Sequence, residues 1–332
     1  MRIAVCRPQV PFSRGGAEIF TDELVRQLRE RDHEADIVSV PFKWYPGQRV
    51  LTQAFLWRLL DLTEADGRRI DLVVATKFPS YCVRHPNKVV WLLHQFRQAY
   101  ELDRTDLGQF SESAEDRATR RRVERLDRVT LGEARKLFAT SRNVADRLQR
   151  STGLDPEVLP HPPQELAYRT DAYEPFVFSV GRLDRAKRID LLIEAAAKQG
   201  VDLVVSGEGP DRERLERLAN GRVRFTGRVS EAELADLYAR CRAVFYAPVD
   251  EDFGMVPFEA FLAEKPVVTT TDAGGPLDVV RDRETGRVVE PTVDAVAAAL
   301  EIGEDDARAW GRAGKALAEQ VTWDSSIERL LA

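Results

Sequence analysis

The chain of 332 residues is long enough for two domains of ordinary size, and its 43% hydrophobic residues can fill their cores. The net charge of −6 is unevenly divided, with roughly +4 on the first 170 residues and roughly −10 on the rest. Binding to nucleic acid needs a broad positive footprint, so this composition argues against a nucleic-acid partner. Cys6, Cys82 and Cys241 show no metal-ligand spacing and predict reduced, buried thiols.

The amino-terminal segment MRIAVCRPQV contains an apolar run that is too short for a signal peptide, and it predicts a first strand. No apolar stretch of the sequence is long enough to span a bilayer. We therefore expect a cytoplasmic protein whose contact with a membrane, if it has one, is peripheral and at the inner face.

The first half begins with a strand, a glycine pair and a helix. Residues 2–6 predict a strand, residues 8–14 a proline-bearing loop, and Gly15-Gly16 leads into a helix with Phe20, Leu24 and Leu28 at helical spacing. A ligand could approach the backbone at such a turn, because glycine carries no side chain. The alternative is an ordinary tight turn between strand and helix. The GxGxxG motif of dinucleotide-binding proteins is missing here.

Further strands are predicted at residues 34–40, 71–75, 88–93 and 137–140, each followed by a loop or a helix. This alternation predicts a parallel, doubly wound sheet. His94 follows the strand at residues 88–93, where ligands bind in such sheets, although a structural role for this histidine is the alternative. Prolines between Pro160 and Pro175 break regular structure and mark the domain hinge.

Two helices of the first half combine basic and apolar residues. The helix at residues 50–62 is apolar and has arginines around it, so it could contact a membrane or a lipid-linked acceptor. Packing against the sheet, with the arginines in solvent, is the favoured alternative. The helix at residues 117–128 is rich in arginine and could attract anionic lipid. Its interleaved acids, Glu115, Asp116, Glu124 and Asp127, favour a solvated face of mixed charge.

The second half opens with a buried strand at residues 176–180 and the string GRLDRAKRIDLLIEA. Gly181 allows close approach, and Arg182 and Lys187, five positions apart, can bracket a diphosphate. The helix that starts at Ile189 directs the positive end of its dipole to the same place.

The stretch at residues 249–279 carries two glutamates and two strand-loop-helix units. Glu251 lies in a loop, and Glu259 lies less than one turn into a helix that Pro257 is well placed to open. After a strand at residues 266–270, the string Asp272-Ala273-Gly274-Gly275 ends at Pro276 and a second predicted helix start. Both units would direct free helix amides to one anion site, with a carboxylate near each. The alternative is an acidic loop that caps a helix, followed by an ordinary turn.

As an ordered set, these motifs resemble those of glycosyltransferase family 4, the retaining nucleotide-sugar transferases of GT-B fold. The resemblance covers nearly the whole chain. It implies an α/β fold with two Rossmann-like domains, whose parallel sheets face each other across a cleft. Residues 1–165 would bind the acceptor and residues 166–319 the nucleotide sugar, and a helix at about residues 320–332 would pack back on the first domain.

The resemblance also implies roles for residues. Arg182 and Lys187 would hold the diphosphate, Glu251 would lie against the donor sugar, and Glu259 would hold the ribose hydroxyls. The catalytic residues are then Arg182, Lys187, Glu251 and His94. The donor-binding residues are Gly15, Gly16, Gly181, Arg182, Lys187, Val229, Glu251, Phe253, Gly254, Met255, Val256, Glu259, Gly274 and Gly275. One departure is Arg188, which stands where the family usually has glycine and is expected to add charge and to tighten the turn.

The reaction that the resemblance implies is transfer of a hexose-type sugar from a GDP- or UDP-linked donor to a glycan, glycolipid or small-molecule hydroxyl. Neither a metal nor a cofactor is expected, and the string Asp250-Glu251-Asp252 is interpreted as a coincidental match to metal-dependent transferases. Two alternatives stay open: a nucleotide-sugar epimerase of the same fold, and a non-catalytic subunit that binds a nucleotide sugar. Assembly of bacterial surface polysaccharide or glycolipid is the expected biological setting.

Overall fold

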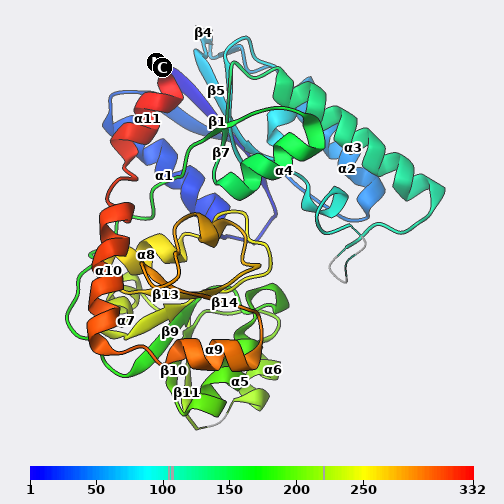
Figure 1. The fold of residues 1–332 in the computed structure, drawn as a ribbon. Coiled ribbons are helices and arrows are strands. Elements are labelled where there is room, and N and C mark those ends of the chain that lie inside the picture. Colours follow the sequence, from blue (N-terminus) through cyan, green and yellow to red (C-terminus); the bar gives the residue numbers. More distant parts are fainter. Residues whose placement is uncertain (104, 106–107, 220) are drawn as a thin grey trace. The chain divides into compact units, whose positions relative to one another are not determined.

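The computed structural model describes residues 1–103, 105, 108–219 and 221–332 (Figure 1). The chain forms two compact units: unit 1 is Met1–His161 with Trp323–Ala332, and unit 2 is Pro162–Thr322. The limits expected from the sequence were 165/166 and 319/320, close to the observed changes at 161/162 and 322/323.

Unit 1 is built on a six-stranded sheet in which all paired strands are parallel, in the order β2-β1-β5-β6-β7-β8. Its strands are β1 (Arg2–Gln9), β2 (Glu34–Pro41), β5 (Leu72–Lys77), β6 (Lys88–His94), β7 (Lys136–Ala139) and β8 (Glu157–Val158). Successive side chains of a strand point to opposite faces, so Val5 joins one core and Cys6 the other. Both faces are therefore covered, which confirms the doubly wound sheet that the sequence predicts.

The helices of unit 1 are α1 (Gly16–Glu30), α2 (Val50–Leu59), α3 (Ala114–Gly132), α4 (Arg142–Thr152) and α11 (Trp323–Leu331). α1 and α11 share one core, where the Phe20 ring lies 4.9 Å from the Trp91 ring and 6.2 Å from the Trp323 ring. α2, α3 and α4 contribute to the other core. The remaining elements are a short hairpin, β3 (Glu64–Ala65) with β4 (Arg68–Arg69), and the 3₁₀ turns η1 (Gly47–Arg49), η2 (Ser80–Cys82) and η3 (Arg97–Ala99).

Unit 2 also has a parallel six-stranded sheet, in the order β11-β10-β9-β12-β13-β14. Its strands are β9 (Phe176–Val180), β10 (Asp202–Ser206), β11 (Val223–Gly227), β12 (Ala243–Phe245), β13 (Val267–Thr270) and β14 (Gly286–Val289). The chain order of the strands reverses between β9 and β12. In open sheets of this kind, ligands bind beyond the carboxyl ends of the strands at that reversal.

The helices of unit 2 are α5 (Ile189–Gln199), α6 (Arg212–Leu218), α7 (Glu231–Arg240), α8 (Val256–Leu262), α9 (Val293–Leu300) and α10 (Glu304–Ala318). Two 3₁₀ turns, η4 (Arg185–Lys187) and η5 (Gly275–Asp278), complete the unit. α7 begins with a capping box, in which Glu233 N donates to Ser230 Oγ and Ser230 N donates to the Glu233 carboxylate. The prediction of a helix that starts at Pro276 is wrong, because the chain there forms only the four-residue 3₁₀ turn η5. At Val279 the backbone has left the helical region.

All three cysteines are buried free thiols, as the sequence predicts. Among the described residues, every helix is either too short or too polar to cross a bilayer.

Candidate functional site

The segments that follow β9 and β12 bring three functional side chains into contact. β9 leads through Gly181 to η4, which ends at Lys187, and β12 leads through Tyr246 to the loop that carries Glu251. The Lys187 ammonium forms an ion pair with the Glu251 carboxylate. The Tyr246 hydroxyl lies 3.3 Å from Lys187 Nζ and donates a 3.2 Å hydrogen bond to Glu251 Oε2. The contact is thus at the strand reversal of unit 2.

This cluster is shielded from solvent, since the Lys187 and Glu251 side chains are only 22% and 20% exposed. Burial by itself lowers the pKa of Lys187, but Tyr246 and Glu251 outweigh burial and raise that pKa above its ordinary value. Burial also raises the pKa of the Tyr246 phenol, and the Glu251 charge adds to the increase. The cluster therefore holds a fixed ammonium charge at physiological pH, which suits the binding of a diphosphate.

Backbone hydrogen bonds join the loop that carries Glu251 to the turns beside it. Four of them span 2.8–2.9 Å: Val249 N to Ala186 O, Asp250 N to Asp272 O, Glu251 N to Ala273 O, and Gly275 N to Glu251 O. A Cβ atom at Gly275 would lie 2.6 Å from the Asp252 carbonyl oxygen, so only glycine lets these two loops approach so closely. Gly275 thus acts through loop packing, in addition to any contact with a ligand.

Arg188 fastens the same loops with its side chain. Its φ of +51° is in the left-handed region, which explains why a glycine would suit this position. Its guanidinium donates two hydrogen bonds to the Asp272 carboxylate, at 2.7 Å and 2.5 Å, and these bonds hold the pKa of Asp272 below its usual value. The Arg188 charge is thus paired with Asp272, and the side chain ties the two loops together.

Arg182 and Gly181 face open space in unit 2. The Arg182 side chain is 66% exposed, and its Nε lies 3.6 Å from a carboxylate oxygen of Asp184. A Cβ atom at Gly181 would meet no heavy atom of the described residues within 4 Å. Arg182 thus lies outside the cluster of Lys187, Tyr246 and Glu251, with a long flexible side chain that can reach for a ligand.

Glu259, on α8, is in contact with a tyrosine of α7. Tyr238 donates a 2.6 Å hydrogen bond to Glu259 Oε2. Burial raises the pKa of Glu259, and the Tyr238 hydrogen bond partly opposes that shift. Glu251 and Glu259 thus have different side-chain partners, Lys187 for Glu251 and Tyr238 for Glu259.

The segment between the two glutamates is mostly structural. The Phe253 ring is buried and stacks on the Phe258 ring at 5.1 Å, and Met255 is the residue that caps α8. The other predicted donor-binding residues of unit 2 lie at turns or at a helix start: Val229 before α7, Gly254 at a φ of +84°, Val256 at the first position of α8, and Gly274 before η5.

Three predicted residues belong to unit 1. Gly15 caps α1 and Gly16 is its first residue, and Gly15 N donates a 2.9 Å hydrogen bond to Glu18 Oε2. Glu18 also pairs with Lys77, which ends β5, at 3.1 Å. β1 and β5 flank the strand reversal of this sheet, so the glycine pair follows a strand at a position typical of ligand sites. His94 ends β6, and its Nδ1 lies 2.7 Å from the Gln95 carbonyl oxygen.

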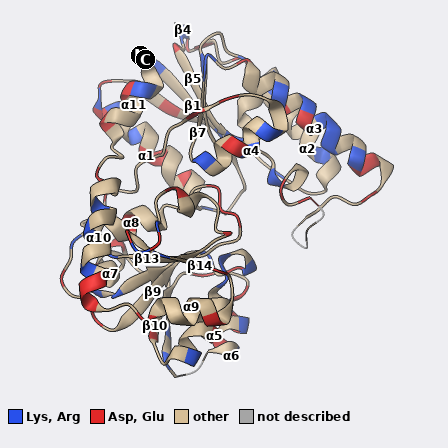
Figure 2. Cartoon of the chain, viewed as in Figure 1, with Lys and Arg blue, Asp and Glu red and all other residues tan. Residues whose placement is uncertain are grey.

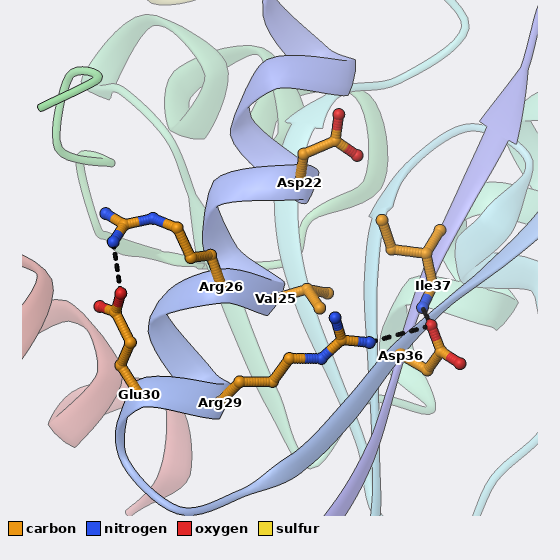
Figure 3. A pocket seen from close by; sticks show the side chains of 7 residues that line it. All are labelled: Asp22, Val25, Arg26, Arg29, Glu30, Asp36 and Ile37. Atoms are coloured by element: carbon orange, nitrogen blue, oxygen red, sulfur yellow. Dashed lines mark hydrogen bonds and ion pairs between the residues drawn. The ribbon is translucent and has the colours of Figure 1, made fainter.

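The two hollows found on unit 1 contain none of these predicted residues. One, of about 480 Å³, lies between α1 and β2 and is lined by Asp22, Val25, Arg26, Arg29, Glu30, Asp36 and Ile37 (Figure 3). Its charged groups pair with each other, as Arg26 does with Glu30 and Arg29 with Asp36. The other, of about 510 Å³, is lined by Arg58, Leu60, Asp61, Thr63, Arg84, His85, Pro86 and Glu133. We assign the chemistry to the strand ends, where the polar groups converge.

Comparison with known proteins identifies the family. Residues 14–162 match the family described as "Glycosyltransferase Family 4", and residues 167–316 match the one described as "Glycosyl transferases group 1". The chain belongs to glycosyltransferase family 4. The fold agrees: the sucrose-phosphate synthase structure from Thermosynechococcus elongatus is 20% identical, with a TM-score of 0.79 over 99% of this chain and 97% of that one. The chain has the GT-B fold that its sequence predicts.

Two further proteins resemble this chain. A GDP-mannose-dependent alpha-mannosyltransferase of Mycobacterium tuberculosis is 39% identical over 113 residues, which are 34% of this chain and 29% of that protein. The Anabaena HepE structure, in complex with UDP-glucose, is 16% identical with a TM-score of 0.70, over 100% of this chain and 98% of that one. The matched parts of the first curated relatives make up 29% and 38% of those proteins' lengths.

The structure also reveals residues that the sequence alone did not indicate, namely Tyr246, Tyr238 and the Arg188–Asp272 pair. Tyr246 directly follows the buried apolar strand β12, and a hydroxyl at the carboxyl end of a buried strand was the available signal. Asp272 was noted only as part of a glycine-rich loop.

We expect Arg188→Gly to be more stable than Arg188→Ala by about 1 kcal/mol, because glycine adopts the left-handed conformation without the Cβ clash. Both variants lose the bond to Asp272, so combining either with Asp272→Ala should reveal a coupling energy of about 1 kcal/mol. Urea unfolding of the single and double variants measures both quantities. Equal stability of the alanine and glycine variants would contradict the strained backbone, and strict additivity would contradict the side-chain tie.

Proposed function

We propose that this family 4 enzyme is a retaining glycosyltransferase that transfers a hexose-type sugar from a GDP- or UDP-linked donor to a hydroxyl of a glycan, glycolipid or small molecule. The observation that supports this most is the meeting of Lys187, Tyr246 and Glu251 at the strand reversal of unit 2. Membership of the family and the printed names of its relatives point to the same reaction class.

The chemistry needs stabilisation of the charge that grows on the diphosphate as the glycosidic bond lengthens. The Lys187 ammonium, with Arg182 reaching in from the adjacent turn, would supply it as a preorganised anion site. When the diphosphate binds, it competes with Glu251 for the ammonium, and Glu251 becomes free to accept hydrogen bonds from sugar hydroxyls. Tyr246 keeps both groups in place during this exchange.

The stereochemical outcome follows from which carboxylates are available. Glycosidase-like double displacement uses two carboxylates on either side of the anomeric carbon. Glu251 interacts with Lys187 and Tyr246, whereas Glu259 accepts a hydrogen bond from Tyr238. We therefore propose a front-face reaction with retention, in which a donor phosphate oxygen accepts the proton of the acceptor hydroxyl. No metal takes part in the proposed reaction.

The acceptor would bind to unit 1, where His94 ends strand β6, whereas Gly15 and Gly16, which follow β1, are proposed as donor-binding residues. We propose a cytoplasmic enzyme that contacts the inner face of the membrane peripherally and works in the assembly of polysaccharide or glycolipid. The positive charge of the first 170 residues, roughly +4, is consistent with an anionic membrane surface nearby.

The test is incubation of the purified chain with single GDP- and UDP-sugars, with and without EDTA. Slow hydrolysis to the nucleoside diphosphate with one donor, unaffected by EDTA, is the expected result. Appearance of an isomeric nucleotide sugar would indicate an epimerase, and binding without turnover would indicate a non-catalytic subunit. Once an acceptor is found, the anomeric proton coupling of the product reports retention. Inversion, or loss of activity in EDTA, would contradict the corresponding part of the proposal.

A further inference from the structure

Unpaired arginines form a strip on helix α3. Arg121, Arg125 and Arg128 recur at spacings of four and three residues, so they share one side of the helix, and Arg122 lies next to them. All four are exposed, and Figure 2 shows basic residues along this helix. Within the described part of the chain none of the four has an ion-pair partner.

Two of the four acids interleaved with these arginines, Asp116 and Asp127, do not neutralise them. Asp116 is buried and accepts hydrogen bonds from Gln48 Nε2 at 2.5 Å and from Ser111 N at 2.7 Å. Asp127 is buried and accepts hydrogen bonds from three side chains: Tyr81 at 2.8 Å, Tyr100 at 2.8 Å and Gln95 at 3.0 Å. The solvated face of mixed charge that the sequence favours is therefore wrong for these two acids, which face inward. The outward side of α3 is more basic than its composition suggests.

An apolar strip lies on helix α2 beside α3. Phe55, Leu56 and Leu59 are 60%, 42% and 65% exposed, and their spacing places them on one side of the helix. The opposite side packs into the core through Ala54 and Trp57. The packing expected for this helix is thus confirmed for one side only, and its other side presents large apolar groups to solvent.

The two helices run side by side in the same direction (Figure 1). Gln48, just before α2, bonds to Asp116 at the start of α3. Arg58, near the end of α2, pairs with Glu133 just after α3. These two contacts hold α2 and α3 together at both ends, so the apolar strip and the arginine strip run alongside each other.

We propose that Phe55, Leu56 and Leu59 of α2, together with Arg121, Arg122, Arg125 and Arg128 of α3, form a docking face for an anionic phospholipid bilayer. Large apolar side chains enter the boundary between headgroups and acyl chains, and arginines beside them bind lipid phosphates with their planar forks. The face thereby gives a place and a lipid class to the peripheral membrane contact proposed above, on which it rests.

A second copy of this chain fits the same face poorly. A two-fold contact places the same patch of both copies against each other, and would bring the unpaired arginines of one copy towards those of the other. That like-charge arrangement is unfavourable, whereas a bilayer rich in phosphatidylglycerol offers negative charge over the whole face.

The experiment is sedimentation with vesicles of phosphatidylglycerol mixed with phosphatidylcholine, and with vesicles of phosphatidylcholine alone. We expect binding to the anionic vesicles that weakens as salt rises, and little binding to the neutral ones. Replacing all four arginines by glutamine should weaken binding by about fivefold for each arginine removed. Phe55→Ser with Leu59→Ser should also abolish stable binding, since apolar insertion is lost. Melting temperatures verify that the variants fold.

A matched control removes three exposed arginines from unit 2 instead, as Arg217→Gln, Arg283→Gln and Arg312→Gln, and should bind as the unchanged chain does. The Lys187→Ala variant should also bind the anionic vesicles normally. Vesicle binding is therefore expected even if the proposed activity is assigned wrongly. Equal binding to neutral vesicles, or unchanged binding after loss of the four arginines, would overturn the proposal. So would a dimer in light scattering that becomes a monomer in the Phe55→Ser, Leu59→Ser variant.

Discussion

Replacing Lys187 by alanine is expected to lower kcat for donor turnover by about 100- to 1,000-fold, the usual cost of removing one preorganised charge-stabilising group. The Lys187 ammonium is fixed between Glu251 and the Tyr246 hydroxyl, and its raised pKa keeps it charged well above neutral pH. Its interaction with the diphosphate grows as the bond to the sugar lengthens, so the loss falls mainly on kcat. Initial rates of sugar-nucleotide hydrolysis measure the effect.

Two further variants distinguish charge from packing. Lys187→Met keeps the apolar stem of the side chain and removes the ammonium, whose Nζ lies 5.3 Å from the Tyr246 ring centre. This variant should be as inactive as the alanine variant. Lys198→Ala removes a solvent-exposed lysine at the other end of α5, where it pairs with Asp294, and should leave the rate unchanged. Because the Lys187–Glu251 pair is largely shielded from solvent, its loss should destabilise the fold by about 1–3 kcal/mol. Full activity of Lys187→Met would show that the Lys187 charge is not needed for donor turnover.

The sequence is informative about this site because the relevant residues follow predictable strands. The strand predicted at residues 176–180 is β9 as observed. Parallel strands of one sheet end at the same edge, so Lys187 and Glu251 could be expected to approach each other. The order of the strands could not be deduced from their spacing along the chain. Only the observed pairing of β9 with β12 shows that the strand reversal lies between them.

Contacts between residues far apart in the chain account for most of what was missed. Arg188 reads as a poor residue for a left-handed turn, and only its bond to Asp272, 84 positions away, explains how it is tolerated. The string RATRRRVERLDR reads as mixed charge until Asp127 is seen to point into the core. Likewise, Tyr246 reads as one more apolar residue until the partners of its hydroxyl are known. Local patterns carry no information about such partners.

The second large effect is expected at Glu259, which we assign to the ribose hydroxyls. Glu259→Ala should lower kcat/KM for the donor by about 100- to 10,000-fold, because two hydrogen bonds to a charged acceptor are lost at about 1.5–3 kcal/mol each. Glu259→Gln keeps the shape and one acceptor oxygen, so its loss should be smaller. Tyr238→Phe is the matched control: it removes the 2.6 Å bond that orients the carboxylate but leaves the acceptor in place, and should raise the donor KM only a few-fold.

The pH dependence gives Glu259 a distinct signature. Burial raises its pKa above the ordinary value, so on acidification it takes up a proton at a higher pH than an exposed glutamate would. Donor affinity should therefore fall as the pH drops through this raised pKa, and Glu259→Gln should lack that part of the profile. The contribution of Glu259 to folding stability changes with pH in the opposite direction to its contribution to donor affinity. The folded state holds the proton more tightly, so this group favours folding at low pH, and its contribution declines as the pH rises through the folded pKa. An unchanged acid limb of donor binding in Glu259→Gln would show that a different carboxylate binds the ribose.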